Sequence, residues 1–125
     1  MRFSVARILG LVVCASALFG GVVAGRGPVP REATNHVVKM TANNTFDPKS
    51  LDIKVGDTVT FENPDGPSHT ATSDDIKTGD PKRTFNTGTV KKGQKACITF
   101  NFELTYSYHC EFHSGMDGKI NVKPQ

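Results

Sequence analysis

At 125 residues the chain has room for one domain with a real hydrophobic core and little else. Fifteen Lys and Arg against twelve Asp and Glu give a formal net charge of +3, and the excess falls to one without Arg2 and Arg7, which lie in a segment predicted to be removed. The lysines are scattered singly or in pairs, which excludes a clustered phosphate-binding surface and therefore nucleic acid as a partner.

Residues 1–24 have the layout of a secretory signal peptide. Arg2 and Arg7 supply a positive start, and residues 8–24 form an uncharged, largely apolar run. We predict cleavage after Ala24, because cleavage there removes the whole run. The alternative is an uncleaved anchor, since about 17 to 25 apolar residues can span a membrane and this run is at the lower end of that range. Export predicts a periplasmic or extracellular protein with no membrane span in its mature form.

Short runs with a period of two follow a flexible leader. The leader, residues 25–35, is rich in Gly, Pro and polar residues, and the predicted domain covers residues 36–125. The predicted strands are residues 36–41, 50–55, 58–62, 69–72, 84–90, 94–102, 105–110 and 118–122. Residues 73–82 are polar and predict a loop with one helical turn. No segment has a sustained helical period, so we predict an all-β domain of seven to eight strands, an antiparallel sandwich or barrel.

Cys97 and Cys110 are the cysteines of the predicted mature chain, and two cysteines in an exported domain usually form a disulfide. Here the alternation of side chains argues against one. Cys97 shares a face with Lys95, opposite the apolar residues of its run, whereas Cys110 shares the core-directed face of Tyr106 and Tyr108. Because cysteines that point to opposite sides of their sheets cannot reach disulfide geometry, we predict no Cys97–Cys110 bond. Cys97 is then a lone thiol, to which we assign no function.

The spacing Cys110-x-x-His113-x-x-Met116 predicts a metal site, because the loop is too short for the three side chains to diverge far. His69 is the candidate for the fourth ligand, since it begins a strand after a Pro-rich loop, where connecting loops gather. Two imidazoles, a thiolate and a weakly held thioether are the ligand set of a mononuclear blue-copper electron-transfer site. Zinc fits less well, because structural zinc prefers Cys and His.

The other histidines are predicted not to bind the metal. His36 is expected to be exposed on the surface, and His109 points away from Cys110 and is expected to be a structural partner. A thiol nucleophile is disfavoured, because His113 lies on a turn and no orienting acid is evident. Without a Gly-rich phosphate loop or a paired-carboxylate cleft, the chain is not predicted to be an enzyme.

Three stretches carry a resemblance to a known family: FDPKSLDIKVGDTVTFEN at residues 46–63, SHTATSDD at residues 68–75 and YSYHCEFHSGMDGKINV at residues 106–122. They resemble the cupredoxins, specifically the small plastocyanin- and amicyanin-like blue (type 1) copper proteins, over residues 37–122. The two-residue gaps on both sides of His113 are similar to the short ligand loop of amicyanin. The resemblance implies a Greek-key β-sandwich that binds one copper ion through His69, Cys110, His113 and Met116.

The resemblance also implies that His113 reaches the surface within an apolar patch where redox partner proteins dock. The expected members of this patch are Phe112, Gly115, Pro64 and Pro67. Two positions depart from many relatives: Thr70 stands where many have an Asn that braces the ligand loop, and Ser114 stands where many have Pro. These changes bear on the reduction potential rather than on ligation.

The resulting hypothesis is an exported, monomeric one-electron carrier that cycles between Cu(I) and Cu(II). The alternative is a periplasmic copper-binding or delivery protein that uses the same ligands. A third possibility is a metal-free binding sandwich with a disulfide.

Overall fold

A computed structural model describes residues 31–125. The predicted signal peptide at residues 1–24 and the first part of the predicted leader lie outside the described residues. Within residues 31–125, no helix has the length and apolar character needed to cross a membrane.

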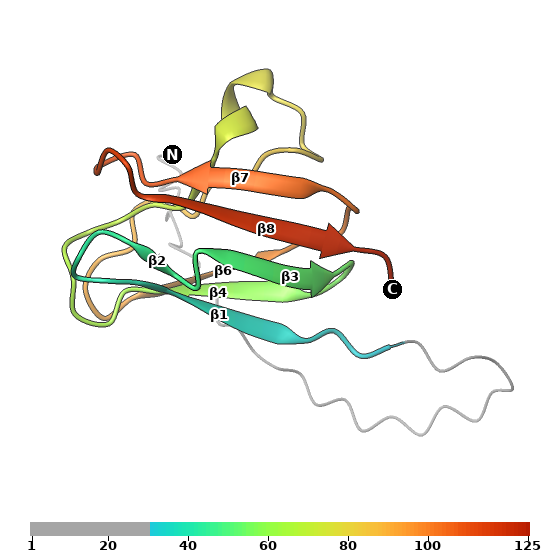
Figure 1. Cartoon of the computed structure of the whole chain (residues 1–125), viewed down its shortest axis with the longest axis horizontal. Coiled ribbons are helices and arrows are strands. Elements are labelled where there is room, and N and C mark those ends of the chain that lie inside the picture. Colours follow the sequence, from blue (N-terminus) through green and yellow to red (C-terminus); the bar gives the residue numbers. More distant parts are fainter. Residues whose placement is uncertain (1–30) are drawn as a thin grey trace, which may run out of the picture.

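Two four-stranded sheets pack face to face in the described part of the chain (Figure 1). The elements are β1 (Asn35–Met40), β2 (Phe46–Asp47), β3 (Ser50–Lys54), β4 (Thr58–Glu62), β5 (Thr72–Ser73), η1 (Asp74–Thr78, a short 3-10 helix), β6 (Lys95–Thr99), β7 (Thr105–His109) and β8 (Asp117–Lys123). One sheet has the order β2-β1-β4-β6 and the other β3-β8-β7-β5. The predicted all-β sandwich of seven to eight strands is confirmed, and the barrel alternative is not.

Both sheets are mixed, so the prediction of antiparallel pairing throughout is wrong for one strand pair in each sheet. β1 pairs with β4 in parallel and β3 with β8 in parallel, while the other pairings between the described strands are antiparallel. The parallel pairs arise because the chain crosses to the second sheet at β3 and returns at β4. As a result, β1 and β4 run side by side from one end of the sandwich to the other.

The core lies between the sheets and follows the alternation seen in the sequence. In β7, Tyr106 and Tyr108 are buried while Ser107 between them is exposed, as predicted. Tyr108 is paired with Gly118 of β8, and its ring lies so close to Gly118 that a β-carbon there would overlap it. The buried apolar residues are Val38, Met40, Phe46, Ile53, Val59, Phe61, Ala71, Phe85, Val90, Phe100, Tyr106, Tyr108, Cys110, Met116, Ile120 and Val122.

Several predicted strands are shorter in the structure than in the sequence pattern. The run at residues 84–90 contributes two isolated bridges, Asn86 to Thr72 and Val90 to His69, instead of a continuous strand. The run at residues 69–72 becomes β5 only at its last residue. β2 has two residues, too few for a periodic pattern, and was not predicted. The helical turn expected within residues 73–82 is η1.

The cysteine predictions have two different outcomes. Cys110 is a free thiol, so the predicted absence of a Cys97–Cys110 disulfide is confirmed. The prediction of a lone thiol at Cys97 is wrong, because Cys97 is disulfide-bonded. Alternation along a strand predicts which face of the sheet a cysteine side chain lies on, but it does not predict whether that cysteine forms a disulfide.

A fully buried carboxylate, Asp57, organises the end of the sandwich where β1 and β4 begin. It accepts hydrogen bonds from the Arg31 guanidinium at 2.7 and 3.1 Å and from the backbone N–H groups of Thr34 and Lys54 at 2.9 and 3.1 Å. His36 Nε2 lies 2.9 Å from the same carboxylate. The expectation of an exposed surface histidine at His36 is therefore wrong, because its ring is partly buried against a partner that alternation along β1 does not reveal.

Burial alone would raise the pKa of Asp57, but the hydrogen bonds from Arg31, Thr34, His36 and Lys54 outweigh it and hold the pKa well below its usual range. We predict that Asp57→Asn lowers the free energy of unfolding by about 1–3 kcal/mol at neutral pH, because the buried carboxylate charge that accepts these hydrogen bonds is lost. A depressed carboxylate pKa stabilises the fold above its unfolded value and loses this effect as the pH falls, so the difference between wild type and variant should narrow below about pH 4. Urea denaturation at a series of acidic pH values measures the difference in free energy of unfolding between wild type and variant. A difference that stays constant with pH would contradict this account.

Candidate metal centre

Two segments far apart in the sequence meet at the end of the sandwich opposite the one where β1 and β4 begin (Figure 1). His69 lies between β4 and β5, and its backbone forms an antiparallel bridge with Val90. Cys110 directly follows β7, and the loop from Cys110 to Met116 leads into β8. The parallel course of β1 and β4 brings Thr41, which follows β1, to this same end.

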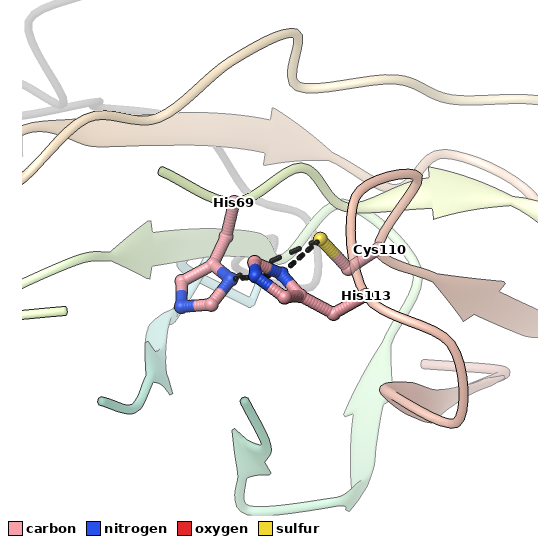
Figure 2. Close-up of side chains that lie close together, drawn as sticks. All are labelled: His69, Cys110 and His113. Carbon is pink, nitrogen blue, oxygen red and sulfur yellow. Dashed lines mark hydrogen bonds between the residues drawn. The ribbon is translucent and has the colours of Figure 1, made fainter. Parts of the chain in front are cut away.

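Figure 2 shows His69, Cys110 and His113 pointing toward one another. The two Nδ1 atoms of His69 and His113 are 3.2 Å apart, and Cys110 Sγ lies 3.8 and 3.5 Å from them. A circle through three atoms at these separations has a radius of about 2.0 Å, which matches the imidazole–metal distance of about 2.0–2.1 Å known for zinc. The three donors therefore fit around one transition-metal ion. Among the described residues, these three side chains form the group of His, Cys, Asp or Glu that is compact enough to hold such an ion.

His69 is prepared for ligation by its surroundings. Burial lowers the pKa of His69; the hydrogen bond to the Thr41 carbonyl opposes this shift, and the nearby His113 adds to it. Its Nε2–H donates to the Thr41 carbonyl oxygen at 3.1 Å, which leaves the Nδ1 lone pair directed at Cys110 and His113. A neutral imidazole with a fixed tautomer is the form that binds a metal.

The ligand loop closes on itself through two backbone hydrogen bonds. Cys110 N–H donates to the Met116 carbonyl at 2.9 Å, and Met116 N–H donates to the His113 carbonyl at 3.3 Å. Gly115 supplies the positive φ, +80°, that the turn requires. The loop buries the Met116 side chain almost completely, while His113 stays partly exposed.

Thr70 braces the two ligand-bearing segments against each other. Its hydroxyl accepts a hydrogen bond from the Glu111 N–H at 2.9 Å, and its own N–H points at Cys110 Sγ at 3.4 Å. A hydroxyl at this position thus ties the residue after His69 to the residue after Cys110. The departure from an Asn does not remove the brace.

Thr70 offers a test of this brace in the metal-free protein. Thr70→Val keeps the shape of the side chain but leaves the Glu111 N–H without its acceptor, and we expect it to lower the free energy of unfolding by about 1–3 kcal/mol. Thr70→Ser keeps the hydroxyl and is the matched control, with a smaller loss. Denaturant titration of both variants measures the difference, and equal stability of the two would show that the hydroxyl braces nothing.

The four predicted ligands differ in how close to one another they lie in the structure. His69, Cys110 and His113 come together, and Met116 lies buried in the same loop. His109 lies on the other face of β7, as predicted, and its Nδ1 is 2.6 Å from Asp74 Oδ1. The sequence did not reveal the Thr41 carbonyl as the hydrogen-bond partner of His69, because a backbone acceptor has no residue-type signal.

A pair of imidazoles and a thiol on a β-sandwich defines a mononuclear metal protein with a soft donor set. The chain belongs to the copper binding proteins of the plastocyanin/azurin family, whose model matches residues 33–123. Copper is accordingly the metal of this site, and the resemblance to the cupredoxins is confirmed.

Similar proteins include an amicyanin from Paracoccus denitrificans, 31% identical over 123 residues that cover 90% of this chain and 92% of the relative. Among solved structures, the reduced state of an amicyanin mutant is 33% identical, with a TM-score of 0.62 over 77% of this chain and 87% of the other. An oxidised amicyanin mutant is 29% identical, with a TM-score of 0.59 over 70% of this chain and 81% of the other.

Proposed function

We propose that this chain is a one-electron carrier that holds one type 1 copper ion through His69, Cys110, His113 and Met116. The observation that carries the proposal is the triangle of two Nδ1 atoms and one sulfur, whose size fits a single ion. Bound copper supplies a one-electron change between Cu(I) and Cu(II).

The residues of the chain have distinct parts in this proposal. The Cys110 thiolate would provide a strongly covalent bond to the copper for electron passage, and the Thr70 N–H near its sulfur would offset some of its negative charge. His69 is buried and held by Thr41, so its position stays the same in both oxidation states. Met116, buried in the ligand loop, would hold the copper weakly through its thioether, which would favour Cu(I).

Electron exchange with other proteins is proposed to occur at the surface around His113. His113 is the partly exposed ligand, and the neighbouring Phe112 side chain is 53% exposed. Pro64, Pro67 and Gly115 are also exposed. An exposed aromatic side chain beside a partly exposed ligand supports docking of redox partner proteins here.

The protein is proposed to work outside the cytoplasm, in the periplasm or extracellular space, as a monomer and not as an enzyme. The positive start and apolar run of residues 1–24 support export. The cluster of donors among the described residues, together with the match to a copper-binding family, supports a carrier over an enzyme.

Reconstitution of purified metal-free protein with Cu(II) tests the ligand set. We expect an intense blue colour in the wild type, loss of this colour in Cys110→Ser because the thiolate is its source, and disruption of it in His69→Ala. His109→Ala is the matched control, since this histidine lies next to the ligand Cys110 in the sequence yet bonds Asp74, and the colour of the variant should be intact. His36→Ala should also stay blue. A colourless wild type would refute the proposal, as would a blue Cys110→Ser.

Copper delivery with the same ligands is the second candidate function, and two measurements separate it from electron transfer. A carrier should exchange electrons rapidly between its own oxidised and reduced forms, as measured by NMR line broadening in mixtures, and should keep its copper when a metal-free acceptor protein is added. Transfer of copper to the acceptor together with slow electron exchange would favour delivery.

A further inference from the structure

Asn63 is a fully buried amide at the start of the loop that leads from β4 to His69. Its Nδ2 donates to the carbonyls of Pro67 and Val90 at 2.6 and 2.9 Å, and its Oδ1 accepts from the Gly66 N–H at 3.0 Å. Both amide hydrogens and the amide oxygen are therefore used. The side chain folds the loop back on itself and ties it to Val90.

The first connection from Asn63 to His69 runs through Val90. His69 N–H donates to the Val90 carbonyl at 3.1 Å, and Val90 N–H donates to the His69 carbonyl at 2.7 Å. The Val90 carbonyl thus accepts from both Asn63 and His69. This shared acceptor fixes the backbone of the histidine.

The second connection runs through Gly66 to the imidazole ring of His69. A β-carbon at Gly66 would lie 3.1 Å from the Cα and 3.2 Å from the amide nitrogen of Ala42, so the loop held by Asn63 packs directly on the residue after Thr41. Thr41 is itself fixed by a turn in which its N–H donates to the Thr45 carbonyl at 2.9 Å. Its carbonyl accepts the Nε2–H of His69, so this packing reaches the ring.

We propose that Asn63 is a positioning residue for His69. It holds the backbone of this histidine through Val90 and the ring through Gly66 and Thr41, so that Nδ1 stays aimed at Cys110 and His113. The inference rests on the proposed function in that His69 is taken to bind copper. Asn63 itself does not contact the metal donors.

The first measurement uses the metal-free protein with Asn63→Ala. In the wild type, we expect the Nε2–H proton of His69 to give an NMR signal protected from solvent exchange by its bond to Thr41. In the variant the ring is no longer held, and this signal should be lost. The second measurement is competition for copper with a chelator, where the variant should bind about 10-fold to 100-fold more weakly, the usual range for a lost partner of a metal ligand.

Asp57→Asn is the matched control, because it removes a buried polar hub at the opposite end of the sandwich. It should lower stability while leaving both the His69 signal and copper affinity unchanged. If Asn63→Ala lowers stability but changes neither measurement, Asn63 is a structural residue only and the proposal is overturned.

A second variant decides the matter if Asn63→Ala does not fold. Gly66→Ala keeps the amide but pushes on Ala42, and the same two changes, in milder form, are expected. Their absence would overturn the proposal. Failure of the wild type to bind copper would instead refute the proposed function, while the His69 signal in metal-free protein would still report on the role of Asn63.

Discussion

The metal site depends on one constraint: three electron-rich donor atoms must be held within 3.8 Å of one another by the protein. Two imidazole nitrogens and a sulfur gain only weak hydrogen bonds from such proximity before a cation arrives, so the scaffold must supply the order. It does so with backbone groups and one side-chain hydroxyl at the end of the sandwich. The Thr41 carbonyl fixes the ring of His69, the Thr70 hydroxyl joins the two ligand segments, and the ligand loop is closed by its own hydrogen bonds.

The two ends of the sandwich differ in role: one carries the Asp57 network and the other carries the metal donors. The parallel strands β1 and β4 run between them. Asp57 gathers Arg31, His36 and two backbone amides where these strands begin, and the metal donors gather beyond the point where they end. A charge network that stabilises the fold is thus kept away from the site. The site end can then keep a neutral His69 and an exposed aromatic residue, Phe112, away from the buried Asp57 carboxylate.

The features that could be predicted from the sequence are those with a local signal. Alternation placed Tyr106 and Tyr108 in the core, and the tight spacing of Cys110 and His113 brought them together because a short loop leaves little freedom. His69 was found because the spaced donors needed a partner from another loop. By contrast, three features depend on residues that are distant in sequence, and a single sequence has no periodic signal for such contacts. They are the contact of His36 with Asp57, the parallel strand pairs and the hydrogen bonds of the Asn63 amide.

The packing of Tyr108 on Gly118 has a consequence for how related chains are recognised. Any side chain at residue 118 would displace the tyrosine two positions before Cys110, and the strand that presents the thiol would shift with it. Gly118 has no donor side chain, yet a substitution there should be poorly tolerated because any β-carbon would overlap the Tyr108 ring. A search pattern for such proteins is therefore sharper when it runs two residues past Met116 and ends on this glycine.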